Sequence, residues 1–207
     1  MTTDSHAEGT STVPTGIAIR DVREQLFDAA ERILLRDGPN ALTSRAVTTE
    51  AGCAKGVLHR HFADFDSFLA ELVEHRIGRI QDQAAALHAA AGSGTVAGNL
   101  TGSLTSVFES VAVAIVGLIT FRDGLRTRLR RSRPVGVPLL GEATAMIADY
   151  LTAERDLGRI ATDADVDTLA LTLVGSGHLL FAGREDAPPD PAAVDRVVTG
   201  VIAGVLR

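Results

Sequence analysis

Apolar residues recur at three- and four-residue spacing through almost the whole chain, and the strict alternation that is typical of a β-strand is nearly absent. This spacing places apolar side chains on one face of an α-helix. The 207 residues, of which 45% are hydrophobic, suffice to bury a core without crosslinks. The sequence therefore predicts an all-α fold.

Helix-breaking and helix-starting residues divide this pattern into segments. Gly38–Pro39 would end the first helix, and Asp190–Pro191 would begin the last with a capping side chain before a proline. Thr162 and Asp165 resemble a capping box ahead of another helix. The expected helices cover about residues 20–36, 44–51, 54–61, 65–91, 96–121, 139–155, 163–183 and 191–206.

Composition points to an ordinary cytoplasmic protein. Residues 1–18 are rich in Thr, Ser and Gly and lack the basic and apolar segments of a signal peptide, so we expect a disordered tail. The apolar run 111–121 is shorter than the roughly 20 residues that span a bilayer, so we expect a buried helix and no membrane partner. The single cysteine, Cys53, excludes a disulfide within this sequence, and we interpret it as a small buried residue rather than a redox sensor.

Two short expected helices meet at Gly52. Thr43 stands before the first of them, where its hydroxyl can accept a hydrogen bond from a free amide of the first turn. Two short helices around a glycine turn are typical of a helix-turn-helix. A plain hairpin within a helical bundle is the alternative.

The charge of this segment differs from that of the chain. The whole sequence carries a formal charge of −6, whereas residues 44–61 hold Arg45, Lys55 and Arg60 against Glu50 alone. Because phosphate neutralisation supplies most non-specific DNA affinity, this local basic face favours DNA binding while the acidic remainder stays away from it.

The same segment carries a resemblance to a known family. The sequence L-T-S-R begins at Leu42, A-G-C-A-K-G at Ala51 and H-R-H-F at His59, after a helix that ends in Gly-Pro. Taken in this order over about residues 20–80, it resembles the TetR family of transcriptional regulators. The resemblance implies a DNA-binding domain at residues 19–66, followed by a ligand-binding and dimerisation domain at residues 67–207.

Several positions would contact double-stranded DNA by this resemblance. Ala54 stands where family members commonly have a capping serine or threonine, His59 and His61 where they have tyrosines, and Phe65 where a lysine is common. Because imidazole gains a proton near roughly pH 6.5, we expect DNA binding to tighten as the pH falls. The predicted DNA-binding residues are Thr43, Ser44, Arg45, Ala54, Lys55, Gly56, Val57, His59, Arg60 and His61.

The resemblance also implies a homodimer and an effector pocket in the second domain. The predicted interface residues are Val166, Leu169, Leu173, Val174, Gly177, Leu180, Val194, Val197, Val198, Val201, Ile202 and Val205. The predicted pocket residues are Leu104, Phe108, Ile115, Phe121, Met146, Tyr150 and His178. With one tyrosine and no tryptophan, such a pocket would favour an apolar or amphipathic effector, although the same residues would equally serve as a packed core.

Two sequence features, an arginine-rich run and one histidine, allow more than one interpretation. The run from Arg122 to Arg133 contains six arginines and could be a second nucleic-acid patch or an anion site, but a solvated face balanced by Asp123 and the nearby acidic body is our prediction. His178 could line the pocket or form a hydrogen bond at an interface.

No spacing of a catalytic or metal-binding site is present. The sequence lacks a G-x-S-x-G motif and a Walker loop, and His59 and His61, two residues apart, point to different sides of a helix. We therefore expect no enzyme, no cofactor and no metal.

The expected function is a ligand-responsive repressor on a palindromic operator, with activation as an open alternative. A helical protein-interaction module, or a small-molecule carrier, that has lost DNA binding is the rival.

Overall fold

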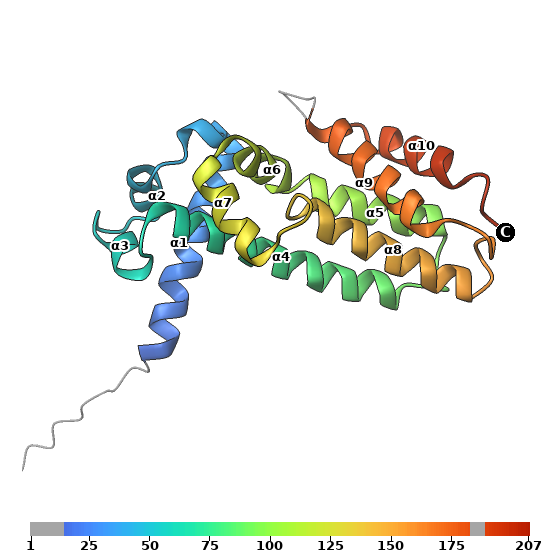
Figure 1. Cartoon of the computed structure of the whole chain (residues 1–207), viewed down its shortest axis with the longest axis horizontal. Helices are drawn as coiled ribbons and strands as arrows, with labels where there is room; N and C mark the ends of the chain where they lie inside the picture. Colours follow the sequence, from blue (N-terminus) through green and yellow to red (C-terminus); the bar gives the residue numbers. More distant parts are fainter. Residues whose placement is uncertain (1–14, 183–188) are drawn as a thin grey trace, which may run out of the picture.

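The computed structural model describes residues 15–182 and 189–207 (Figure 1). These residues form ten α-helices and one short 3₁₀ helix, and the prediction of an all-α fold is confirmed. Residues 1–14 of the predicted tail lie outside the described part, whereas residues 15–18 belong to the first helix. The elements are α1 (Thr15–Asp37), η1 (Pro39–Ala41), α2 (Ser44–Glu50), α3 (Val57–His61), α4 (Phe65–Ala89), α5 (Val96–Phe108), α6 (Ala112–Phe121), α7 (Asp123–Ser132), α8 (Leu140–Asp156), α9 (Val166–Ala182) and α10 (Pro191–Ile202).

A small head at one end of the molecule contains α1, α2 and α3 (Figure 1). Its core is aromatic: Phe27 packs against Phe62 and Phe68, with ring centroids 5.9 and 5.6 Å apart. Phe62 also meets Phe68 edge-on at 5.0 Å. Because Phe62 follows α3 and Phe68 lies in α4, this cluster fixes the short third helix between α1 and α4.

Helix α4 joins the head to the larger body (Figure 1). Its apolar face, including Phe68, Leu72 and Ile80, is buried along most of its length. In the body, α4 and α9 both pack against α8, and α10 packs against α5 and α9. A movement of α4 would therefore displace side chains packed against it in both the head and the body.

Helix boundaries in the body differ from the expectation, most clearly between α5 and α6 and at the start of α9. The single helix expected over residues 96–121 is two helices, α5 and α6, bent by 55° around Glu109–Val111. The break contains neither glycine nor proline; instead the Ser110 hydroxyl donates to the Val107 carbonyl and accepts from the Ala112 amide, which satisfies backbone groups freed by the bend. The cap of α9 is Asp165, which accepts from the Thr168 amide at 3.1 Å, so the capping box predicted from Thr162 is wrong.

Within residues 15–182 and 189–207, no single helix is long and apolar enough to cross a membrane, and α5 with α6 meets the length and composition only as a bent pair.

Candidate nucleic-acid interface

Helices α2 and α3 are fastened to α1 by side chains that reach their backbone ends. Gln25 Nε2 donates to the Ala51 carbonyl at the end of α2, at 2.9 Å. Arg23 Nη1 donates to the His61 carbonyl at the end of α3, at 3.2 Å, and its guanidinium lies 4.4 Å from the centroid of the Phe62 ring. The two short helices therefore have a defined orientation although each is too short to be stable alone.

The turn between the two helices follows the sequence expectation in part. Thr43 Oγ1 accepts from the Ala46 amide at 3.1 Å, which confirms the predicted cap of α2. Gly52 has φ +66°, a left-handed conformation that glycine adopts without strain, and it ends that helix. The third helix begins at Val57 rather than near Ala54, because residues 54–56 form a turn in which the Val57 amide donates to the Ala54 carbonyl.

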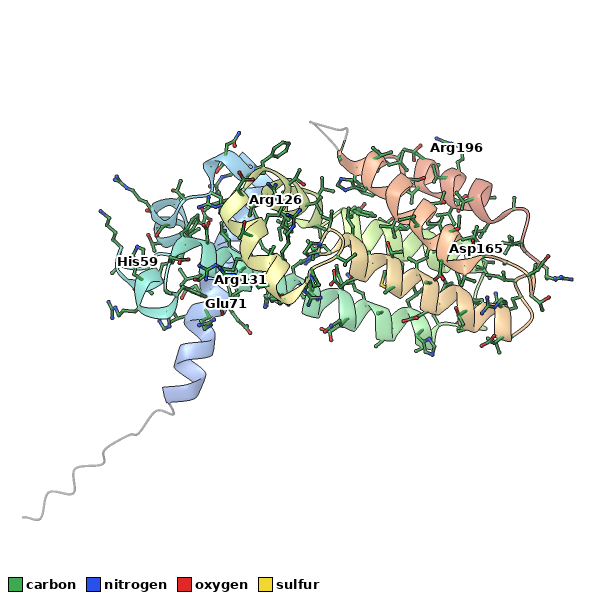
Figure 2. The ribbon with its side chains drawn as sticks, in the orientation of Figure 1. His59, Glu71, Arg126, Arg131, Asp165 and Arg196 are labelled. Carbon is green, nitrogen blue, oxygen red and sulfur yellow. The ribbon has the colours of Figure 1, made fainter. Side chains whose placement is uncertain are left out.

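The predicted DNA-binding residues all lie on this segment, and most are exposed. Ser44, Val57 and His61 are half-buried; the exposed members are Thr43, Arg45, Ala54, Lys55, Gly56, His59 and Arg60. Figure 2 places His59 at the far end of the head, away from the body. Val57 is half-buried because it packs against the head core, where its side chain helps to hold α3 in place.

Three cations on this surface are free to bind an anion. Among the described residues, Arg45, Lys55 and Arg60 form no ion pair or side-chain hydrogen bond. The nearby Glu50 is already engaged, because Arg32 and Arg36 donate to its carboxylate at 2.9 and 3.1 Å. These hydrogen bonds lower the pKa of Glu50. The acidic group of the segment is thus neutralised within the head, while its basic groups face solvent.

The start of α4 lies directly behind this surface. The Asp64 carboxylate accepts from the Ser67 amide at 2.6 Å and caps the helix. This bond, together with the Ser67 hydroxyl, lowers the pKa of Asp64. Phe65, found where a lysine was expected from the resemblance, instead stacks on Phe68 and lies beneath the guanidinium of Arg122.

Contacts between α7 and α4 were missed by sequence reasoning. Arg122 Nε pairs with Asp66 at 2.6 Å, and Arg128 Nη2 pairs with Asp64 at 2.9 Å. Arg133 pairs with Glu74 at 2.9 Å. These three arginines are half-buried, so the predicted arginine face is solvated only in part, whereas its charge is balanced by nearby acidic groups and Arg126 pairs with Asp123, as expected. The partners on α4 precede the arginines by more than fifty residues, so no local pattern could identify them.

The predicted pocket residues do not gather around one hollow. Leu104, Phe108, Ile115, Met146 and Tyr150 are buried in the continuous core. Tyr150 donates to Glu154 Oε1 at 2.5 Å and accepts from Asn99 Nδ2 at 2.9 Å.

Two predicted pocket residues lie apart from this core group. His178 is half-buried beside Phe108, and its buried Nδ1 has no hydrogen-bond partner among the described residues. Phe121 is 88% exposed, because it ends α6 on the side facing Pro39, where it lines a surface hollow of about 760 Å³. Placing it inside a central pocket was therefore wrong.

The predicted interface residues mostly face inward. Seven of them, Val166, Leu173, Val174, Gly177, Val194, Val198 and Ile202, are buried within the chain itself. Leu169, Leu180, Val197, Val201 and Val205 are half-buried. At Gly177 a Cβ atom would lie 2.8 Å from the Phe108 ring, so this glycine permits α9 to approach α5. The apolar side chains that α9 presents to solvent are Leu171 and Leu179, 66% and 75% exposed.

Comparisons with known proteins agree with this architecture. Residues 26–72 match the model of the bacterial regulatory proteins of the tetR family. No curated protein sequence matches the chain.

Solved structures share the fold over most of the chain. A TetR-family transcriptional regulator from Agrobacterium tumefaciens, 12% identical, covers 91% of this chain and 100% of its own with a TM-score of 0.68. A putative TetR-family transcriptional regulator from Rhodococcus sp., 18% identical, has the same coverage and a TM-score of 0.67. The fatty acid degradation regulator FadR from Bacillus halodurans, 16% identical, covers 88% of this chain and 95% of its own with a TM-score of 0.65. Residues 26–72 therefore form a domain of the tetR family of bacterial regulatory proteins, and the chain as a whole shares the fold of these solved structures.

Proposed function

We propose that this TetR-family DNA-binding regulator is a ligand-responsive repressor that binds a palindromic operator as a homodimer. The observation that carries the proposal is the exposed surface of α2 and α3, on which Arg45, Lys55 and Arg60 have no partner among the described residues. Free cations beside a short exposed helix suit the phosphate walls and base edges of a major groove. Such a protein would act in the bacterial cytoplasm, where the DNA is.

The dimer in this proposal forms through the outer face of α9 and α10. Leu171, Gly175 and Leu179 follow one another at four-residue spacing on the exposed side of α9. Large apolar side chains at such exposure beside a small residue favour a helix packed across them. A two-fold axis here would place two heads on one side of the assembly, and a palindromic operator would follow from this symmetry.

Regulation in this proposal passes through α4, which contributes to the head core and to the body core. A ligand that binds one arrangement of the body more tightly would change the spacing of the two heads, to an extent set by its difference in affinity. Repression that is relieved by ligand is the direction we propose.

The test begins with selection of duplexes from a random DNA library by the purified protein. Affinity for the selected duplex would then be measured against salt for the wild type, Arg45→Ala, Lys55→Ala and a control, Arg131→Ala. Arg131 is an exposed arginine of α7 that lies outside α2 and α3 (Figure 2). We expect a palindromic sequence whose affinity falls about tenfold or more in the two head variants and stays unchanged in the control. The absence of an enriched sequence, with weak binding that is equal in all four proteins, would exclude DNA reading and favour a protein-interaction module.

A further inference from the structure

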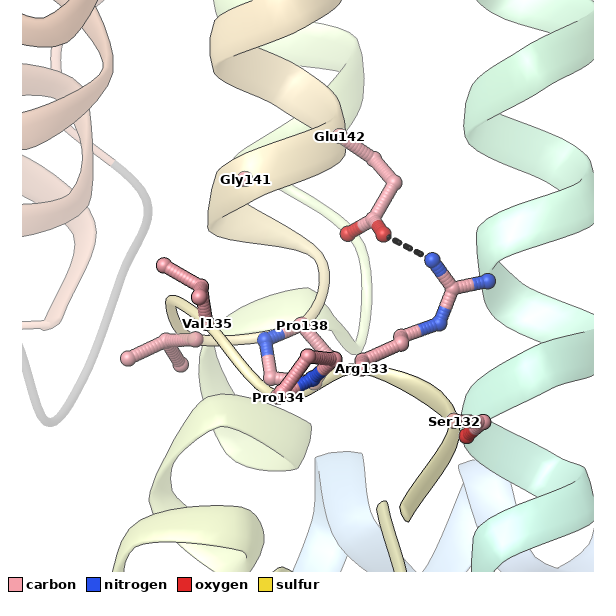
Figure 3. Close-up of a pocket in the computed structure, with 8 residues that line it drawn as sticks. Ser132, Arg133, Pro134, Val135, Pro138, Gly141 and Glu142 are labelled. Atoms are coloured by element: carbon pink, nitrogen blue, oxygen red, sulfur yellow. Dashed lines mark hydrogen bonds and ion pairs between the residues drawn. The ribbon is translucent and has the colours of Figure 1, made fainter. Parts of the chain in front are cut away.

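Three arginines of α7 and its C-terminal connection border an apolar hollow. Arg126, Arg130 and Arg133 line a space of about 170 Å³ between the end of α6, α7 and the connection to α8. Its apolar wall includes the buried Ile119 and Leu129. A second hollow of about 290 Å³ lies against the same connection and shares the walls formed by Arg133, Val137 and Pro138 (Figure 3).

The charge of the first hollow is one-sided. None of its nine lining residues is acidic. Arg126 is held by Asp123 and the Thr120 carbonyl, and Arg133 by Glu74 and Glu142. Arg130 forms no ion pair or hydrogen bond with any residue that the structure describes. The hollow therefore presents one free guanidinium, next to two that are already oriented, over an apolar wall.

This combination selects a chemical class. Guanidinium groups bind carboxylates through paired, charge-assisted hydrogen bonds, whereas the apolar wall favours a hydrocarbon body. The volume is below the roughly 300–1,000 Å³ of drug-sized sites, which favours a small molecule. Resting on the proposed function, and naming its effector class, we propose that this hollow binds a small amphipathic carboxylate, with Arg130 as its principal contact and the hydrocarbon against Ile119 and Leu129.

Arg133 connects the hollow to the head. Its Nε and Nη2 atoms donate to the two oxygens of Glu74 on α4, at 3.1 and 2.9 Å, while Nη1 donates to Glu142 on α8 at 2.6 Å. A carboxylate that pairs with Arg133 competes with Glu74 for its guanidinium. Because Glu74 lies on α4, which also contributes Phe68 to the head core, this competition reaches the head.

The connection itself is strained at the beginning of α8. Leu139 is a buried non-glycine residue with φ +74°, and its amide is held by Glu142 Oε2 at 2.7 Å. The glutamate that orients Arg133 thus also holds this backbone, so a ligand at Arg133 acts on both α4 and the start of α8.

Isothermal titration of the full chain tests the site, with hexanoate, hexanol and inorganic phosphate as probes. The variants are Arg130→Gln and Arg126→Gln, and the matched control is Arg131→Gln, an exposed neighbour that does not line the hollow. We expect the wild type and the control to bind hexanoate more tightly than hexanol or phosphate. Arg130→Gln should weaken hexanoate binding about tenfold or more, and Arg126→Gln should weaken it less. Equal hexanoate binding in the wild type and Arg130→Gln, or no binding, would overturn the site.

A second measurement separates this inference from the proposed function. Operator affinity, with and without saturating hexanoate, should change several-fold in the wild type and remain constant in Arg130→Gln. Tight operator binding that hexanoate leaves unchanged would overturn the effector assignment and leave the regulator standing. A protein that binds hexanoate but no operator would overturn the regulator and leave a carboxylate-binding site.

Discussion

Tyr150 is the only tyrosine of the chain, which also lacks tryptophan, so one side chain reports directly on the body core. Burial and the hydrogen bond to Glu154 raise the pKa of Tyr150 to about 12. A raised pKa in the folded state means that the folded chain holds the phenol proton more tightly than the unfolded chain does. The stability from this group is therefore complete below about pH 10 and is lost as the pH rises toward 12.

Absorbance at 295 nm measures this ionisation without interference from other tyrosines. We expect the phenolate signal of the folded protein to rise with a midpoint near pH 12, and Glu154→Gln to lower this midpoint because the charged neighbour is removed. Circular dichroism at each pH verifies that the helices persist. A titration midpoint near pH 10, in a chain that is still helical, would show that the Tyr150 hydroxyl is neither buried nor hydrogen-bonded to Glu154 as described.

His59 allows a second prediction at this scale. Its ring is exposed at the tip of the head, where the proposed DNA contact would lie. His59→Phe removes the ring nitrogens that can hydrogen-bond to a phosphate or a base edge, so we expect operator affinity to fall several-fold. Fluorescence anisotropy at constant pH and ionic strength compares the two proteins. Equal affinities would exclude a polar contact from His59.

At the scale of elements, the best test is the cap at the beginning of α4. Asp64 accepts from the Ser67 amide and also pairs with Arg128, so Asp64→Ala removes both the cap and a tie to α7. We expect the Tm of Asp64→Ala to fall by roughly 2–4 °C. The Tm of Asp64→Asn should fall less, because asparagine still caps the helix although it carries no charge. Thermal unfolding at pH 7 compares the three proteins.

The pKa of Asp64 gives the same experiment a pH dependence. Because hydrogen bonds from Ser67 lower this pKa, the folded chain favours the ionised carboxylate. Its contribution is present above about pH 4 and is lost as the pH falls below that value. The difference in Tm between wild type and Asp64→Asn should narrow in acid, and a constant difference down to pH 3 would contradict the assignment.

Element boundaries were predictable where a local side chain or a breaker decides them. Thr43, Gly52 and Asp190 each act within a few residues of their own position, and the structure confirms all three. The bend between α5 and α6 was not predictable, because it contains no helix breaker. It depends on packing, since Phe108 and Ala112 on either side of it are both buried in the core.

The candidate site shows the same division between local and distant information. Exposure of Arg60 follows from the helical register that buries Leu58 and Phe62, so the sequence was sufficient to predict it. The pairing of Arg128 with Asp64 joins residues 64 positions apart, and it could only be learned from the fold. In the same way, the resemblance assigned the apolar residues of α9 and α10 to a partner subunit, whereas in the fold α9 packs against α5 and α8, and α10 packs against α5.

At the scale of the whole molecule, the proposed function depends on how two copies are arranged on DNA. If the outer face of α9 is the interface, a charge introduced at its centre would be buried in the dimer without a partner. The free energy of desolvating that charge would then prevent the two copies from associating. Leu171→Glu and Leu179→Glu should therefore each yield a monomer with unchanged helix content. Light scattering after size-exclusion chromatography measures the mass, with Leu157→Glu as the control, an exposed leucine at the far end of α8.

The same variants connect assembly to operator binding. A dimer engages two half-sites about 34–36 Å apart, and a monomer keeps only the contacts of one. We expect the two monomeric variants to lose at least a hundredfold in operator affinity while retaining the weak, salt-sensitive binding of a single head. A variant that remains dimeric would place the interface elsewhere, and a monomer with undiminished affinity would show that one copy reads the operator alone.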